Sequence, residues 1–507
     1  MNQLKAGAFL SYLSIILNNI IGILYTPYLL RMLGQNEYGL YSLVASIVAY
    51  LTVLDLGFAN AIIRYTAKYR AENKEKEQYE MFGMFIILYC CIGMVAFLIG
   101  LGLYFNIGNL FHSTMNIEDL GKIKIMMLLM VFNIAFTFPM SIWGAIITAY
   151  ENFIFQKLIN IARIILNPIV MIILLYMGYK AIAMVIAITA FNIATLCINA
   201  WYCRYKLHIK VKFGKFHWGF LREISIYSFW IFLDSIMNRV YWSTGQFILG
   251  MVSGAKAIAI YAIAIQLSNI FIGFSTSISG VFLPKVTAMI TLGKDEKVIS
   301  DLFIRTGRIQ YIIMAFILIG FILFGKQFII LWAGESYTEA YTISLLLFIP
   351  LTIPLIQNVG ISIIQAQNKV KFRSIMYIII AIGSLCVSIP LAKQYGGIGC
   401  AIGTSSALIC GQIIAMNIFY YKKIHLNIPK FWKEIMKMSI PPITIGSIGF
   451  FSLKFISINN VPTLITAISC FTIIYITLIW FTTMNNYERE LFRKPINIIF
   501  HKITYKK

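Results

Sequence analysis

Long apolar segments separated by short polar ones run through the whole chain. About 20 residues at a rise of 1.5 Å per residue span the hydrocarbon of a bilayer, so each apolar segment is long enough to cross it as a helix. The predicted spans cover residues 8–32, 38–63, 82–104, 123–148, 161–177, 181–201, 224–250, 256–282, 309–331, 341–365, 374–393, 398–420, 438–456 and 462–483. The pattern predicts an all-α polytopic membrane protein of about 14 transmembrane helices.

Composition and charge support this prediction. Of 507 residues, 60% are hydrophobic and 12% are charged, and the formal net charge is +23. A charge of this size occurs in nucleic-acid-binding proteins, but here 33 of the 42 Lys and Arg residues fall between spans on one side of the predicted membrane. Such asymmetry marks the cytoplasmic side. We expect both termini in the cytoplasm and no nucleic-acid partner.

A weak internal repeat divides the chain. The residues Tyr38–Tyr41 open the second span and Ile258–Tyr261 open the eighth, while Pro139 and Pro354 interrupt the fourth and tenth. Six spans repeated in the same orientation predict two parallel lobes around a central cavity. The expected parts are a six-helix lobe at 1–222, a six-helix lobe at 223–433, and two further helices with a basic tail at 434–507.

The predicted seventh span, residues 225–250, carries Asp234 and Arg239 near its middle, where a charge facing lipid costs a few kcal/mol. Both charges share one broad side of the helix with a set of polar and aromatic residues: Tyr227, Asn238, Tyr241, Trp242 and Gln246. Two interpretations remain open. The charges form an interhelical salt bridge, or this side lines a cavity that contacts a polar ligand.

Asp55 is a second acid within a predicted span. It is either a hydrogen-bonded carboxyl that joins the first two spans, with Asn18 or Asn19 as partner, or an ion-coupling group. Asn18 gives the first span a polar side, and Arg64 lies at the inner membrane edge. The sequence has neither a phosphate-binding GxxxxGK[ST] loop nor a CxxC pair, so no cofactor and no metal are expected.

Several stretches resemble the O-antigen and capsule flippases, the Wzx-type branch of the multidrug/oligosaccharidyl-lipid/polysaccharide exporter superfamily. They are LLRMLGQNEYGLYSLV, LDLGFANAIIRY and WSTGQFILGMVSGAKAIAIYAIA. The resemblance implies two six-helix lobes around a cationic cavity, and alternating access that carries a polyprenyl-diphosphate-linked oligosaccharide across the bacterial plasma membrane. It also implies a polysaccharide polymerase and glycosyltransferases as partners.

The residues can be assigned roles in that activity. The guanidinium fork of Arg239 suits a diphosphate, and Asn18, Arg64 and the polar side of the seventh span would line the cavity. Asp55 and Asp234 are the expected coupling groups for H⁺ or Na⁺.

Two other functions compete with this one. A cation-coupled multidrug antiporter of the same fold would favour acids over an arginine in the cavity. A membrane polysaccharide polymerase or ligase would need acids near the first outer turn, where the sequence offers only Glu37.

Overall fold

The computed structural model describes residues 3–214, 218–279, 282–367, 369–455, 458–491 and 493. Within these ranges the chain is helical, without a β-strand. It divides into two compact units, unit 1 (Met1–Ala262 and Leu385–Cys400) and unit 2 (Ile263–Ser384 and Ala401–Lys507). The repeat boundaries expected at residues 222 and 433 stay a prediction.

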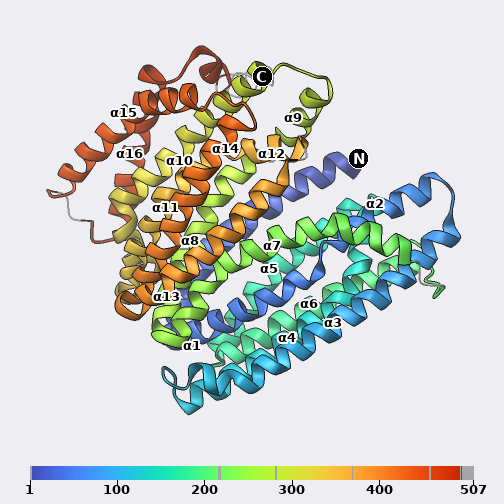
Figure 1. Ribbon diagram of the computed structural model, residues 1–507. Helices are drawn as coiled ribbons and strands as arrows, with labels where there is room; N and C mark the ends of the chain where they lie inside the picture. The colour runs from blue at the N-terminus through green and yellow to red at the C-terminus, as the bar shows by residue number, and fades with distance from the viewer. Residues whose placement is uncertain are drawn as a thin grey trace, which may run out of the picture. The chain divides into compact units, whose positions relative to one another are not determined.

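Unit 1 contains the first seven α-helices and the start of the eighth (Figure 1). The elements are α1 (Gln3–Leu51), η1 (Thr52–Asp55), α2 (Phe58–Ala71), α3 (Glu75–Phe111), α4 (Ile117–Ala149), α5 (Phe153–Tyr176), α6 (Ala181–Tyr205), α7 (Trp218–Val252) and α8 (Ala255–Ser279).

Unit 2 contains the rest of α8 and most of the remaining chain. Its further elements are α9 (Phe282–Thr291), α10 (Glu296–Ala333), η2 (Glu335–Tyr337), α11 (Glu339–Ile356), α12 (Val359–Ala366), α13 (Val370–Leu408), η3 (Ile409–Ala415), α14 (Met416–Lys422), α15 (Ile428–Ser452) and α16 (Val461–Thr482).

Ten helices in the described ranges are long and apolar enough to cross a membrane. Two of them, Phe9–Ala71 and Lys371–Lys422, are far longer than a bilayer needs. Each contains a glycine in the left-handed region, Gly34 (φ 74°) or Gly396 (φ 55°), where two helices meet. Counting these as two crossings each, and adding the expected spans α7 and α15, gives about fourteen. The prediction of an all-α multi-pass membrane protein is confirmed.

The core of unit 1 lies where α2, α3 and α4 meet. Phe58, Phe85, Tyr89 and Phe138 are buried together there. Helix association in lipid depends on close packing rather than on the hydrophobic effect, and these aromatic side chains fill the space between the three helices.

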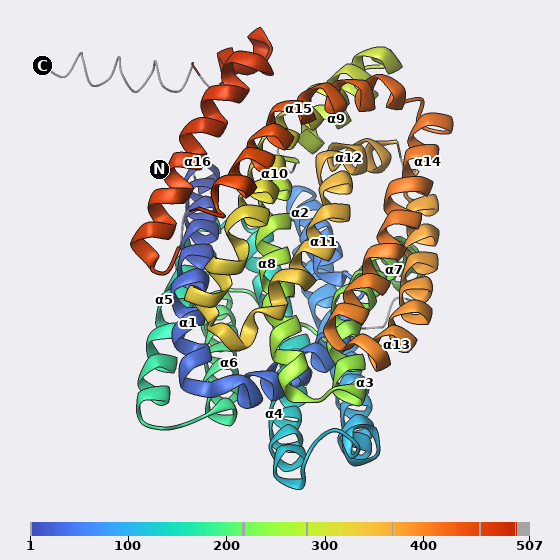
Figure 2. The same ribbon diagram turned by 90° about the vertical axis from the view of Figure 1, so that its left-hand side faces the viewer.

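In unit 2, α15 and α16 pack beside α10 (Figure 2). A buried ion cluster joins these helices. Arg308 of α10 is 7% exposed, and its Nε and Nη2 donate to the two carboxylate oxygens of Glu488 at 2.6 and 3.1 Å. Its Nη1 donates to Glu434 of α15. Pairing on both sides offsets the cost of burying the guanidinium.

Candidate functional site

The second half of α1 runs antiparallel to α7, in a register set by two contacts. A Cβ on Gly39 would lie 1.9 Å from the carbonyl oxygen of Ala255, the first residue of α8, two residues beyond the turn that ends α7. Farther along, the hydroxyls of Tyr50 and Thr244 share a hydrogen bond. Tyr50 is eleven residues after Gly39, and Thr244 is eleven residues before Ala255. The two contacts are therefore separated by the same number of residues along both segments, as expected for helices packed antiparallel.

Continuing this register brings two charged residues to one level. Asp55 lies five residues beyond Tyr50, and Arg239 lies five residues before Thr244. Packing of α7 continues onto η1 and α2. Because both steps are five residues and α7 packs on η1, Asp55 and Arg239 lie at about the same depth of unit 1.

The α-helix is interrupted at the level of Asp55. One 3₁₀ turn covers Thr52–Asp55, and Leu56 and Gly57 then take left-handed φ values of 52° and 72°. A left-handed leucine costs about 1–3 kcal/mol, which the surrounding packing must supply. Interrupted transmembrane helices are a recurring feature of transporter binding sites, because backbone groups become free to contact a ligand or ion.

Asp55 has a fixed partner in α3. The Tyr89 hydroxyl donates to Asp55 Oδ1 at 2.9 Å. Tyr89 is fully buried and stacks on Phe138 of α4, so its hydroxyl is held in place. The described side-chain partner of this carboxylate is thus Tyr89 rather than Asn18 or Asn19. Asp55 itself is only half-buried.

The described side chains of α7 differ in their exposure. Arg239 is exposed, and Trp242 and Gln246 are half-buried. Tyr241 is 7% exposed and meets the Trp242 ring edge to face, with 4.9 Å between centroids. Trp242 and Gln246 are therefore better placed than Tyr241 to contact a ligand.

The side chains of Tyr227, Asp234 and Asn238 lie outside the described residues. The interhelical salt-bridge interpretation of these charges and the coupling role of Asp234 stay predictions.

The structure places an arginine where the sequence led us to expect a membrane edge. Because α5 begins at Phe153, Arg163 lies ten residues inside the helix rather than at its end. It belongs to a polar stripe that follows one face of α5: Gln156, Asn160, Arg163 and Asn167. Their helical spacing was the sequence signal that could have identified this face.

A hydrogen-bond network holds Arg163 in unit 1. Its Nη1 donates to Asn192 Oδ1 of α6 at 3.5 Å. The Asn192 amide donates in turn to Asn133 Oδ1 at 2.7 Å and to Thr137 Oγ1 at 2.8 Å, both on α4. With its amide nitrogen bonded twice, Asn192 must present its oxygen to Arg163.

Asn18 lies at the same depth as Arg163. A Cβ on Gly7 of α1 would be 2.6 Å from the Phe153 Cβ, so both helices start at the same level, and they pack along each other. Asn18 is eleven residues after Gly7, and Arg163 is ten residues after Phe153. Both side chains are exposed.

Arg64 of α2 is exposed as well, with its guanidinium carbon 5.8 Å from the centroid of the Tyr65 ring. Nothing in these contacts joins it to Asp55 or Arg239.

Unit 1 therefore exposes arginines and amides at membrane depth. An arginine that faced lipid there would cost a few kcal/mol, so we expect Arg163 and Arg239 to face an aqueous space. Guanidinium groups bind phosphate oxygens, and amides hydrogen-bond to hydroxyl groups. No group of His, Cys, Asp and Glu in the described ranges could hold a metal ion.

Comparisons with known proteins give the family. The model of the family described as "Polysaccharide biosynthesis protein" matches residues 4–289, more than half of the chain. A candidate O-antigen transporter from Shigella flexneri is 22% identical over 395 residues, which cover 76% of this chain and 90% of the relative.

Solved structures of transporters share the fold. A lipid II flippase in an inward closed conformation has a TM-score of 0.73 at 17% identity, covering 94% of this chain and 98% of that one. An inward-facing multidrug resistance transporter of the MATE family has a TM-score of 0.59 at 14% identity, covering 82% and 95%. These relatives are transporters and flippases rather than enzymes. The chain therefore belongs to the polysaccharide biosynthesis protein family, and the Wzx-type flippase membership expected from its sequence is confirmed.

Proposed function

We propose that this protein carries a polyprenyl-diphosphate-linked oligosaccharide across the bacterial plasma membrane by alternating access, for the assembly of a surface polysaccharide. The observation that supports this most is the pair of exposed arginines in unit 1, Arg163 inside α5 and Arg239 inside α7. An anionic ligand would stabilise both guanidinium groups away from bulk water.

The two arginines have different surroundings. Asn192 orients Arg163, whose neighbours are amides and hydroxyls that suit sugar contacts. Arg239 lies level with Asp55 on a helix that also carries Trp242, whose ring can stack on a sugar. We assign the diphosphate to Arg239, and the first sugars to the face of Arg163 and Asn18.

Asp55 is the proposed coupling group, with Asp234 as a second. Asp55 sits at the helix interruption and is half-buried, so binding of H⁺ or Na⁺ would change the charge near Arg239. An ion that binds one conformation more tightly shifts the balance between inward-open and outward-open states.

Glu37, the acid that a polymerase or ligase would need near the first outer turn, already has hydrogen-bond partners. Glu37 is 5% exposed and accepts a hydrogen bond from Lys122 Nζ at 2.8 Å. Its second oxygen accepts from the backbone N–H of Ala181 at 3.4 Å. These contacts make Glu37 a structural link between α1, α4 and α6, which disfavours the polymerase or ligase alternative.

The proposed arrangement in the cell follows from charge. Even without Arg163, which lies inside α5, the excess of Lys and Arg on one side of the predicted membrane is almost unchanged, so we place both termini in the cytoplasm. The protein would then receive its cargo from glycosyltransferases on that side and deliver it to a polysaccharide polymerase on the other.

The test is replacement of Arg239 in a strain that lacks the chromosomal copy. Arg239→Ala should leave the protein in the membrane but stop export, so that lipid-linked oligosaccharide accumulates on the cytoplasmic side. Arg239→Lys should retain part of the activity, because it keeps the charge and loses the fork. Arg204→Ala, an exposed arginine in the last turn of α6, is the matched control.

A double variant separates this role from a structural one. Asp234→Asn combined with Arg239→Gln removes both partners of the alternative salt bridge. Normal export by that variant would show that the two charges only balance each other, and the assignment of Arg239 would be wrong. Extrusion of cationic drugs by the wild type would favour the multidrug alternative.

A further inference from the structure

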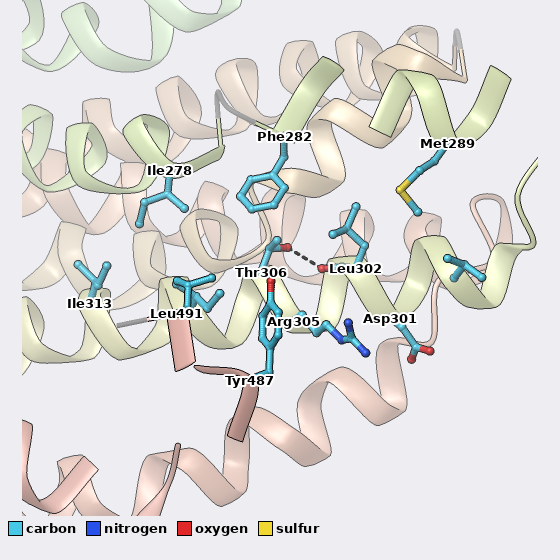
Figure 3. Close-up of a pocket in the computed structure, with 12 residues that line it drawn as sticks. Ile278, Phe282, Met289, Asp301, Leu302, Arg305, Thr306, Ile313, Tyr487 and Leu491 are labelled. Carbon is cyan, nitrogen blue, oxygen red and sulfur yellow. Dashed lines mark hydrogen bonds between the residues drawn. The ribbon is translucent and has the colours of Figure 1, made fainter. Parts of the chain in front are cut away.

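Unit 2 contains an apolar cavity of about 620 Å³ that none of the proposed transport residues line. The end of α8, together with α9, lies on one side of the first half of α10, and the segment after α16 lies on the other (Figure 3). The apolar lining residues are Ile278, Phe282, Met289, Val298, Leu302, Ile309, Ile313 and Leu491. The volume falls within the roughly 300–1,000 Å³ of small-molecule sites.

Two charged side chains line this cavity, and they differ in whether an ion pair compensates the charge. Asp301 is paired with Lys430 Nζ at 3.0 Å, so its charge is largely compensated. Arg305, one turn farther along α10, makes no ion pair within the described part of the chain. Its guanidinium carbon lies 5.4 Å from the centroid of the Tyr487 ring. The cavity therefore combines an apolar interior with one exposed cation.

The position of this cation along α10 matches a membrane surface. Between Arg308 and Lys326 the helix carries no charged residue, and these 18 steps correspond to roughly 27 Å, close to the thickness of the hydrocarbon. Arg305 lies about one turn outside that stretch, at the level of lipid head groups. Ile309 and Ile313 lie within it, at the level of acyl chains.

The wall opposite α9 is anchored rather than loose. Tyr487 precedes Glu488, which is 1% exposed and holds Arg308 through two hydrogen bonds. Asn485 also stabilises this segment, because its side-chain oxygen accepts a hydrogen bond from the backbone N–H of Glu488 at 2.9 Å. The Tyr487 ring is thereby held beside Arg305, and the cavity has a defined shape.

We propose that this cavity binds an anionic phospholipid of the bilayer. One acyl chain would occupy the space beside Ile278, Ile309 and Ile313, and the phosphate would bind Arg305. The site lies apart from Arg163 and Arg239 in the chain, so the proposal does not depend on which cargo the protein carries. Its role would be to hold α9, α10 and the segment after α16 together.

The test is lipid retention by the purified full-length protein, measured by native mass spectrometry during titration with phosphatidylglycerol or phosphatidylcholine of matched chains. Arg305→Gln should weaken phosphatidylglycerol binding about tenfold, the loss expected for one charge-assisted hydrogen bond. Lys297→Gln, which removes an exposed charge from the same helix outside the cavity, should change it less than twofold.

A second variant tests the cavity itself. Val298→Trp adds bulk to the cavity wall. Val298 is 45% exposed, so the protein should still fold, but the larger side chain should exclude the acyl chain of the lipid from the cavity. Unchanged phosphatidylglycerol binding by Val298→Trp would place the lipid elsewhere and overturn the proposal. Equal losses in Arg305→Gln and Lys297→Gln, or equal binding of phosphatidylcholine, would do the same. If equimolar polyprenyl phosphate displaces the bound phosphatidylglycerol, the cavity binds the carrier lipid instead, and the proposal is wrong.

Discussion

Within unit 1, the hydroxyl of Tyr50 is hydrogen-bonded to the hydroxyl of Thr244, and this contact aligns α1 with α7. Five residues beyond it on each side lie Asp55, at the helix interruption, and Arg239. An acid and a base at one level can respond to the same ligand, because binding of an anion by Arg239 changes the potential at Asp55. The cargo and the coupling ion would then bind at the same level of unit 1, close enough for each to affect the binding of the other.

Cross-linking tests this alignment. In a variant whose eight cysteines are replaced, the pair Asp55→Cys and Arg239→Cys should react with a short bifunctional thiol reagent. The pair Asp55→Cys and Gln246→Cys should react more slowly, since Gln246 is seven residues, about 10 Å, farther along α7. Faster reaction of the second pair would contradict the register.

The bond between Tyr89 and Asp55 leads to a prediction about coupling. Asp55→Asn removes the charge and should make export independent of pH and sodium, measured in inverted membrane vesicles. Tyr89→Phe keeps the charge but removes the hydrogen bond, so it should shift the pH dependence and reduce stability by about 1 kcal/mol.

Tyr475→Phe is the matched control for this experiment. Tyr475 is a fully buried tyrosine of unit 2 whose hydroxyl donates to the Ile312 carbonyl at 2.8 Å. It should lose similar stability without a change in the pH profile. If Asp55→Asn retains the normal pH and sodium dependence, coupling does not depend on Asp55.

Arg163 should matter for export although it lies far from Arg239 in sequence. We expect Arg163→Gln to reduce export at least tenfold, because a charge-assisted contact to the ligand is lost. Asn192→Ala should have a smaller effect, since it releases the guanidinium without removing it. Asn106→Ala changes an exposed asparagine whose described hydrogen bond goes to Gly102 of its own helix, and it should be neutral. Normal export by Arg163→Gln would exclude Arg163 from the site.

Gly39 should be the least replaceable glycine of α1. A methyl group there would lie 1.9 Å from the Ala255 carbonyl oxygen, so Gly39→Ala must push α1 away from the start of α8. Overpacking of this kind costs about 1–3 kcal/mol. At Gly22 nothing lies within 4 Å of the added methyl, and Gly22→Ala should not destabilise. Thermal unfolding in detergent measures both, and equal melting temperatures would refute the contact.

The ion cluster of unit 2 makes a stability prediction. Glu488→Gln leaves Arg308 buried with a weakened partner and should cost about 3–5 kcal/mol. Asp301→Asn breaks the exposed pair with Lys430 and should cost less than about 1 kcal/mol. Denaturation of the purified protein compares the two variants. A loss as small for Glu488→Gln as for Asp301→Asn would mean that Arg308 is hydrated.

Much of the fold could be predicted from local pattern. Backbone groups within a bilayer must satisfy their hydrogen bonds inside the segment, so a long apolar stretch can only be a helix, and its length identifies it as a span. For the same reason Asp55 and Arg239 were recognisable as functional candidates, because a charge within such a stretch needs a partner or water. The family was recognisable from short motifs in the same spans.

The partners of these residues were decided by the tertiary structure alone. Nothing near Asp55 in the sequence indicates Tyr89 of α3, and nothing near Tyr50 indicates Thr244 of α7. Side-chain hydrogen bonds between transmembrane helices contribute only about 0.6 kcal/mol each on average, too little to impose a pattern on the local sequence. Helix register, the network around Arg163 and the cavity beside Arg305 arise when many such contacts act together, and they exist only in the folded chain.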